Sequence, residues 1–480
     1  MEHSRGGTVQ PFWRRQTGRR AIRRPRPQPI RIDLRPLRTR VARPRGPVLL
    51  IYGFAGLIVV GTILLMLPIS TSAGNAAPFL DALFTATSAV CVTGLVVVNT
   101  GTYWSPFGQA VILVLIQVGG LGFMSMSTIL LLLIGRRITF QERMRLREAL
   151  GEHVVGGIVR LLRRIAYTSF AIELAGAALL YIQFSRDFPV LDAVWKSAFH
   201  SVSAFNNAGF DILSGNTSFL VYQSNVLMLG TLSVLIILGS ISYTVLADFV
   251  KTRGMARLTL DSRLVVTINI FLWMLGAVVI LLAEFTNEST LGPMPPGLKL
   301  VNAAFQSVVP RTPGFSSVDI GALREFTLFF MAALMFIGGA SGSTAGGIKV
   351  NTLGVLLAAV WSAIRGRDQV EAFGRELPED VVNRALAVVV LSLGLVFSAI
   401  LLLSLTEVHA FIRILFEALS AFGTVGLTTG ITPLLSPLGR LIIIVLMFAG
   451  RLGPLTVALA LAEREEARHI RFAQERIKIG

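Results

Sequence analysis

Four short glycine-containing loops hold the residues of this chain that could carry chemistry. The chemistry open to them is coordination of a cation by backbone carbonyl oxygens, because glycine adopts the backbone angles that turn successive carbonyls toward one axis. The loop glycines are Gly94, Gly209, Gly314 and Gly426. The residues directly before them, whose carbonyls would join the site, are Val92, Thr93, Asn207, Ala208, Thr312, Pro313, Thr424 and Val425.

The loops share residues at nearly fixed offsets. A phenylalanine lies ten residues before Gly94, Gly209 and Gly426, and a Ser-Ala pair lies six and five residues before the same glycines. The third loop departs from this spacing, since Phe305 and Ser307 lie nine and seven residues before Gly314. The glycines are 115, 105 and 112 residues apart. We infer a fourfold internal repeat.

One such loop alone would be better explained by glycine allowing helices to pack closely in a membrane. Four loops in register favour an ion-binding filter instead. The fourth loop adds a more specific match, because Thr424-Val425-Gly426 has the same residues as the start of the TVGYG loop of potassium channels.

Composition indicates the elements that position these loops. Of the 480 residues, 53% are hydrophobic and only 15% are charged, which excludes an ordinary soluble protein. Eight apolar segments are long enough to span a bilayer, and a shorter helical segment lies between the members of each consecutive pair. The predicted spans are 48–68, 107–134, 166–184, 225–249, 264–284, 327–363, 382–405 and 438–462, and the predicted half-helices are 79–90, 190–205, 298–309 and 409–422.

The predicted fold is therefore an all-α polytopic membrane protein. Four pseudo-repeats of span, re-entrant half-helix, filter loop and span would surround one central pore. We divide the chain into an Arg/Pro-rich arm (1–47), repeat 1 (48–135), an amphipathic cytoplasmic linker (136–165), repeat 2 (166–250), a cytoplasmic loop (251–263), repeat 3 (264–363), a second cytoplasmic loop (364–381), repeat 4 (382–462) and a tail (463–480).

Charge sets the orientation. No Lys or Arg lies between 46 and 135, whereas 135–164 carries eight Arg. The positive-inside rule then places both termini in the cytoplasm and the filter loops on the outer side. The arm contains 14 Arg and is predicted to be disordered and to contact anionic lipid headgroups. Specific binding of nucleic acid by the arm is the alternative, and we do not expect it.

Two further features lie below the loops. The sixth span is interrupted by a glycine-rich stretch that should break the helix, although a kinked packing segment is the alternative. Arg451 lies inside the last span, where a charge should face a cavity or pair with a carboxylate or loop carbonyls. The residues assigned to this region are Gly338, Gly339, Ser341, Gly342, Ser343, Thr344, Gly346, Gly347, Lys349 and Arg451. Glu417, nine residues before Gly426, could form a salt bridge, cap locally or add negative potential near the external mouth. His200 occupies the equivalent place in repeat 2 and is expected to be packed rather than catalytic.

With these motifs the sequence resembles the membrane subunit of the Trk/Ktr/HKT superfamily of potassium transporters, most like its KtrB members, over about residues 45 to 465. The resemblance implies that the four glycines are filter glycines, and that glycine at position 94 points to potassium rather than sodium. It also implies that 338–349 is an intramembrane gating loop, with Lys349 near the inner mouth, and that Arg451 is a pore-facing barrier to cations. It further implies a homodimer on a cytosolic KtrA-like ring of nucleotide-binding RCK subunits, in the cell's inner membrane.

The expected function is potassium uptake, with K⁺ as substrate, Na⁺ as a possible second ion and no organic cofactor in this chain. The sequence contains no nucleophile triad, zinc signature or P-loop, so we do not expect an enzyme. The main alternative is a secondary transporter with broken helices, for another monovalent cation such as Na⁺. A membrane-anchored protein acting through the arm is the other.

Overall fold

The computed structural model describes residues 46–122, 158–213, 218–252, 254, 257–311, 313–453 and 456. For residues 46–49 and 158–162 it describes the backbone but not the side chains. All of these residues belong to the unit Arg45–Gly480. Residues 1–45 of the arm, most of the 136–165 linker, the tail and Thr312 lie outside the described residues.

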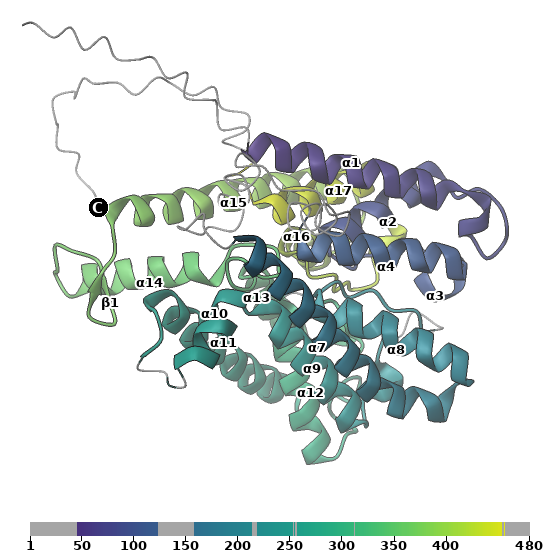
Figure 1. Cartoon of the computed structure of the whole chain (residues 1–480), viewed down its shortest axis with the longest axis horizontal. Helices are drawn as coiled ribbons and strands as arrows, with labels where there is room; N and C mark the ends of the chain where they lie inside the picture. The colour runs from purple at the N-terminus through teal and green to yellow at the C-terminus, as the bar shows by residue number, and fades with distance from the viewer. Residues whose placement is uncertain are drawn as a thin grey trace, which may run out of the picture. The chain divides into compact units, whose positions relative to one another are not determined.

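Four successive triplets of helices make up the described chain (Figure 1). In each triplet a long helix is followed by a shorter one and then by another apolar helix. The triplets are α1 (Gly46–Met66), α2 (Phe79–Cys91) and α4 (Pro106–Leu121); α7 (Ile158–Asp187), α8 (Val190–Phe205) and α9 (Val226–Ser240); α11 (Leu260–Glu284), α12 (Pro296–Val308) and α13 (Glu325–Phe336); and α15 (Glu379–Thr406), α16 (Phe411–Gly423) and α17 (Pro437–Leu452).

Shorter elements connect or extend these triplets. They are α3 (Thr100–Tyr103), α10 (Tyr243–Thr252), α14 (Val350–Ile364), the 3₁₀ turns Pro68–Ser70, Leu220–Tyr222, Val309–Arg311, Ile320–Ala322 and Thr432–Leu434, and the strands β1 (Glu371–Ala372) and β2 (Arg375–Glu376). The strands form an antiparallel hairpin that packs on α14, so the loop predicted for 364–381 is not wholly irregular.

The segments expected to be half-helices are α2, α8, α12 and α16. Each carries one of the repeated phenylalanines, and all four rings are almost completely buried: Phe84, Phe199, Phe305 and Phe416. Burial of such a ring contributes about 1.5–3 kcal/mol. The repeated phenylalanine is thus the core residue that anchors each half-helix.

The triplets contact one another in a closed cyclic order. The last helix of each triplet packs against the half-helix of the next: α4 on α8, α9 on α12, α13 on α16, and α17 back on α2. The closing contact between the last and first triplets includes a salt bridge, in which Arg440 Nη1 lies 2.7 Å from Asp81 Oδ1.

The helices have the lengths and surfaces of a membrane protein. In the described part of the chain, Arg163–Asp187, α11 and α15 are long and apolar enough to cross a membrane, and the bent pair α9–α10 makes a fourth if it counts as one span. The predicted spans 48–68, 107–134 and 327–363 overlap shorter apolar helices, and 438–462 overlaps α17 (Pro437–Leu452). Large apolar side chains such as Phe271, Met274 and Phe397 are more than half exposed, as expected for helices that face lipid.

Several boundaries differ from the prediction. Helix α7 begins at Ile158 rather than 166, so the end of the predicted linker belongs to this helix. Helices α4 and α17 end at Leu121 and Leu452, because the glycines that follow, Gly122 and Gly453, take φ of 81° and 83°. The predicted segments run further, into residues that the structure does not describe.

Candidate functional site

Three of the four half-helices end in the same hydrogen-bonded turn. After α2, the N–H of Thr93 donates to Ser88 O (2.8 Å) and that of Val92 to Ala89 O (3.1 Å). The same pair of bonds closes the other two helices: Ala208 to Ser203 (2.8 Å) and Asn207 to Ala204 (3.1 Å) after α8, and Val425 to Ser420 (2.9 Å) and Thr424 to Ala421 (3.1 Å) after α16. This is a Schellman motif, in which the carbonyls of the repeated Ser-Ala pair accept the two bonds that close each helix.

The turn places non-glycine residues in the left-handed region. Val92, Asn207 and Thr424 have φ of 57°, 59° and 51°. Left-handed backbone costs about 1–2 kcal/mol for a residue with a Cβ and is unusual for a β-branched one. Strain of this kind persists where surrounding structure enforces it, and it is typical of functional loops. Two residues further on, Gly94, Gly209 and Gly426 also have positive φ, of 90°, 67° and 88°.

The third loop turns differently, in keeping with its altered spacing. Helix α12 is followed by the 3₁₀ turn Val309–Arg311, and Gly314 does not have positive φ. Pro313 is buried in this loop, and Thr312 lies outside the described residues.

The four loop glycines meet backbone to backbone. A Cβ on any one of them would collide with the main chain of the next loop: Gly94 with Ala208 and Gly209, Gly209 with Gly314, Gly314 with Gly426, and Gly426 with Thr93 and Gly94. The contacts close into a ring in chain order. No position in this ring has room for a side chain.

The other predicted loop residues surround this ring and are buried. Those that the structure describes are less than 2% exposed: Val92, Thr93, Asn207, Ala208, Thr424 and Val425. The hydroxyls of Thr93 and Thr424 have no hydrogen-bond partner among the described residues. Residues from all four repeats are therefore brought to one place.

The glycine-rich stretch separates two helices, as expected. Helix α13 ends at Phe336 and α14 begins at Val350. The ends of the intervening loop are tied together, since Gly338 N–H donates to Ile348 O (2.8 Å) and Val350 N–H to Gly339 O (3.0 Å). Residues 338–349, which we call the intramembrane loop, therefore form a loop whose two ends are hydrogen-bonded to each other, rather than a kink within one helix.

The intramembrane loop contacts the glycine loops directly. In the orientation that satisfies its neighbours, the Asn207 amide oxygen accepts from the Thr344 hydroxyl (2.8 Å) and from Ser240 N–H (3.1 Å). On another side, a Cβ on Gly346 would collide with the Thr424 side chain, and one on Gly347 would lie 3.3 Å from Gly423 Cα. Glycine is needed here because the two backbones approach so closely.

The same loop explains a bend that the sequence did not predict. The segment 225–249 was expected to be one span, but α9 and α10 meet at 97°. A continuous helix would need the carbonyls of Gly239 and Ser240 for its next turn. Instead, the backbone N–H of Thr344 donates to Gly239 O (3.3 Å), and Ala340 N–H donates to Ser240 O (3.0 Å).

Two cationic side chains also hold the intramembrane loop. Arg451 donates from Nη1 to Thr344 O and from Nη2 to Gly119 O (2.5 Å) and Gly120 O (3.3 Å). Lys349 Nζ donates to Ala345 O within the loop. Arg451 is thus bonded to backbone carbonyls, one in the intramembrane loop and two near the end of α4.

Arg311 is a further anchor that sequence reasoning missed. Its Nη2 donates to Gly338 O (2.8 Å) and its Nη1 to Asn269 Oδ1 on α11 (2.6 Å). The side chain is only 2% exposed. A charge directly before Thr312-Pro313-Gly314, at membrane depth, was the available signal.

In three of the half-helices, one side chain forms hydrogen bonds with the segment that follows the loop. Glu417 accepts from Thr428 Oγ1 (2.9 Å) and from the Thr432 hydroxyl. His200 Nε2 accepts from Ile212 N–H (3.3 Å), and Gln306 Nε2 donates to Ser316 Oγ (2.8 Å). The sequence left the roles of Glu417 and His200 open, and both brace the segment behind a loop. The described residues contain no group of His, Cys, Asp and Glu able to hold a metal ion.

Comparison with known proteins decides the family. A family model described as TrkH, cation transport protein, matches residues 39–470. The chain belongs to this family. The TrkH-family chain is 42% identical to Ktr system potassium uptake protein B of Bacillus subtilis, over 90% of this chain and 96% of that one. It is 40% identical to potassium/sodium uptake protein NtpJ of Enterococcus hirae, over 92% and 99%.

A solved structure agrees with the fold of this TrkH-family chain. The potassium transporter TrkH from Vibrio parahaemolyticus superposes with a TM-score of 0.69 at 18% identity, over 87% of this chain and 84% of that one. The resemblance inferred from the sequence is confirmed, and so is the membrane-protein character.

Proposed function

We propose that this protein is the ion-translocating subunit of a potassium-uptake system. K⁺ would cross the membrane through a single pore between the four repeats, stripped of water by backbone carbonyls of the four glycine loops. The observation that carries this proposal is the closed ring of glycine backbones in chain order. A ring of carbonyl oxygens is how proteins replace the hydration shell of K⁺.

The electrostatics of the loops favour a cation. The C-terminal ends of α2, α8 and α16 all lie directly before a loop, and a helix C-terminus carries partial negative charge. The proposed ion-binding residues are those predicted, namely Val92, Thr93, Gly94, Asn207, Ala208, Gly209, Thr312, Pro313, Gly314, Thr424, Val425 and Gly426.

Potassium is the proposed substrate because two relatives are named for its uptake. Glycine at all four filter positions agrees with this choice. One of these relatives is also named for sodium, so Na⁺ is the second ion to test. We propose no organic cofactor in this chain.

The intramembrane loop is proposed to be the gate. Its bonds to the second loop through Thr344, and its close packing on the fourth loop, support this role. Arg451 would fix the loop and place a positive charge below the filter. A change in the loop's position would then alter the path immediately below the ion-binding loops.

Assembly and orientation follow the same proposal. The protein would be a homodimer in the inner membrane, with both termini cytoplasmic and lipid at its outer surface. Two relatives are named as protein B of a Ktr system, which implies another component. We propose a cytosolic ring of RCK-type nucleotide-binding subunits as that partner, and no nucleic acid.

A secondary transporter with broken helices is the alternative. The bend between α9 and α10 and the break between α13 and α14 favour it, because such transporters bind substrate at interrupted helices. In that case the cation would bind at the intramembrane loop, and the glycine loops would serve only close packing.

Growth of an uptake-deficient bacterial host in potassium-limited medium tests the proposal. Wild type should restore growth, and Gly426→Ser should restore it poorly or admit Na⁺, because the added side chain collides with the Thr93 and Gly94 backbones. Equal rescue by both proteins, with the same preference for K⁺ over Na⁺, would favour the secondary transporter.

A further inference from the structure

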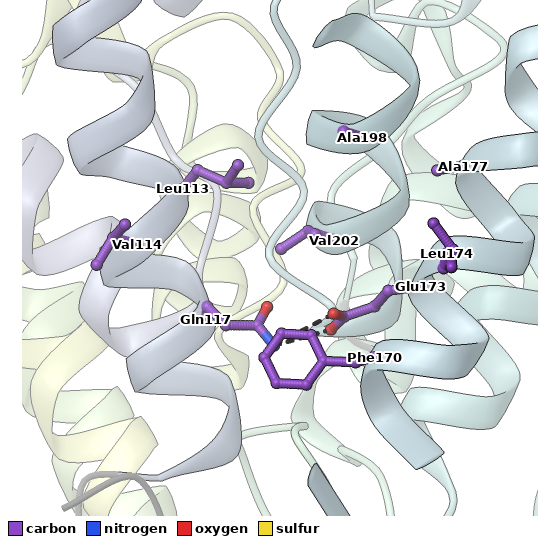
Figure 2. Close-up of a pocket in the computed structure, with 9 residues that line it drawn as sticks. All are labelled: Leu113, Val114, Gln117, Phe170, Glu173, Leu174, Ala177, Ala198 and Val202. Carbon is purple, nitrogen blue, oxygen red and sulfur yellow. Dashed lines mark hydrogen bonds between the residues drawn. The ribbon is translucent and has the colours of Figure 1, made fainter. Parts of the chain in front are cut away.

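A cavity of about 460 Å³ lies among α4, α7 and α8, where the first and second repeats meet. Its walls are apolar, formed by side chains such as Leu113, Phe170 and Val202. Two polar groups interrupt them, and Figure 2 shows the Gln117 amide and the Glu173 carboxylate facing one another at one end. Glu173 lies in the middle of α7, one of the helices long enough to cross a membrane.

The Glu173 carboxylate is bonded to two amides. Gln117 Nε2 lies 3.0 Å from Oε1 and 3.3 Å from Oε2, and Asn206 Nδ2 lies 3.1 Å from Oε1. The two amides are also bonded to each other, since Asn206 Nδ2 lies 2.8 Å from Gln117 Oε1. All three side chains are less than 10% exposed. The network therefore joins three helices away from water.

A carboxylate suits this place better than an amide. It only accepts hydrogen bonds, and both neighbours present N–H groups to it. A glutamine would offer one acceptor oxygen and turn its own N–H₂ toward another donor.

The network ends directly at the second loop. Asn206 directly precedes Asn207 in the chain. Asn207 is the residue with left-handed backbone whose side-chain amide is bonded to Thr344. A Cβ on Gly120 would lie 2.9 Å from Asn206 Cβ, so the Asn206 side chain is also wedged against α4. The equivalent residues before the first and fourth loops are Cys91 and Gly423, which cannot form such a network.

We propose that Glu173 is a positioning residue for the second filter loop, which it holds through Asn206 and Gln117 and so tunes the choice of K⁺ over Na⁺. The inference rests on the proposed filter and adds a determinant that lies outside all four loops. The equivalent residue before the third loop is Arg311, which is bonded to Asn269 and to Gly338 O instead of to a carboxylate, so the described loops are held by different partners.

The test is the K⁺-over-Na⁺ preference of cation flux in vesicles containing the purified full chain. Glu173→Gln should lower the preference roughly threefold to tenfold, the size expected for weakening one or two buried hydrogen bonds. Combining it with Gln117→Glu should restore the preference, because the carboxylate then sits on the other side of the same pair and still accepts from Asn206.

Glu284→Gln is the matched control. Glu284 is also a buried carboxylate on a long helix, but its partners are Asn287, Thr290, Arg324 and Thr327, none of which belongs to a filter loop. It should lower the melting temperature without changing the preference. A purely structural role for Glu173 would give the same result as this control.

The outcomes separate the two proposals. Wild-type preference in Glu173→Gln, with a changed preference in Gly426→Ser, overturns the role of Glu173 and leaves the filter standing. Unchanged preference in both variants overturns the filter itself. If Glu173→Gln does not fold, the swapped double variant decides: failure to recover both folding and preference contradicts the proposal.

Discussion

Thr344 joins three parts of the molecule through one small side chain. Its hydroxyl contacts Asn207 of the second loop and Gly239 at the end of α9, and its carbonyl accepts from Arg451. Residues 344, 207 and 451 are far apart in the sequence. A single residue thus ties the proposed gate to the proposed filter.

Thr344→Val should raise cation flux in the absence of any regulatory subunit. Valine keeps the shape but removes the hydroxyl, so the Asn207 amide loses a partner at a cost of about 1–3 kcal/mol. Flux into vesicles measures the effect. Thr62→Val is the control, because the buried Thr62 hydroxyl bonds only Ile58 O within its own helix. Equal flux in the two variants would argue against coupling through Thr344.

At the residue scale, the sequence could show which residues recur in the loops, but not which side chains they or other buried charges bond to. The four glycines and the Ser-Ala pair were visible because they recur at fixed offsets. Glu173 and Arg311 were not assigned, although both are charges in apolar surroundings, because their partners Gln117, Asn206 and Asn269 come from other helices. Such pairings depend on tertiary packing, which one sequence does not encode in any local pattern.

At the element scale, the break between α13 and α14 was predictable and the bend between α9 and α10 was not. The break lies in a stretch with five glycines between 338 and 347, which lowers helix stability wherever it occurs. The bend lies in an ordinary apolar segment. It arises because the intramembrane loop binds the two carbonyls that the helix would need.

Deleting residues 341–346 should increase flux several-fold without a regulator, if the loop obstructs the path. The backbone bonds between Gly338 and Ile348, and between Gly339 and Val350, can still close the shortened loop. Flux of purified protein in vesicles is the measurement. Replacing the same six residues by a Gly-Ser segment of equal length is the control and should raise flux less. Unchanged or lower flux after the deletion would count against the gate.

At the scale of the whole molecule, the order of packing is the main result. Four units of similar sequence meet in the order in which the chain makes them, and Arg440 and Asp81 join the last to the first. The repeated phenylalanines, serines and glycines were the basis for expecting four units. They did not predict which helix packs on which, nor the β1–β2 hairpin, because these depend on contacts between units.

The central claim is that all four loops form one filter. The most direct test is the K⁺-over-Na⁺ preference of Gly94→Ser, Gly209→Ser, Gly314→Ser and Gly426→Ser, each measured alone in vesicles. Gly430→Ser is the control, since Gly430 has positive φ (91°) like Gly94, Gly209 and Gly426 but open space around its Cβ position. We predict that all four variants lose about tenfold or more in preference, equivalent to about 1.4 kcal/mol, while Gly430→Ser keeps it. If Gly426→Ser alone loses preference and the other three behave like the control, the single four-loop filter is wrong.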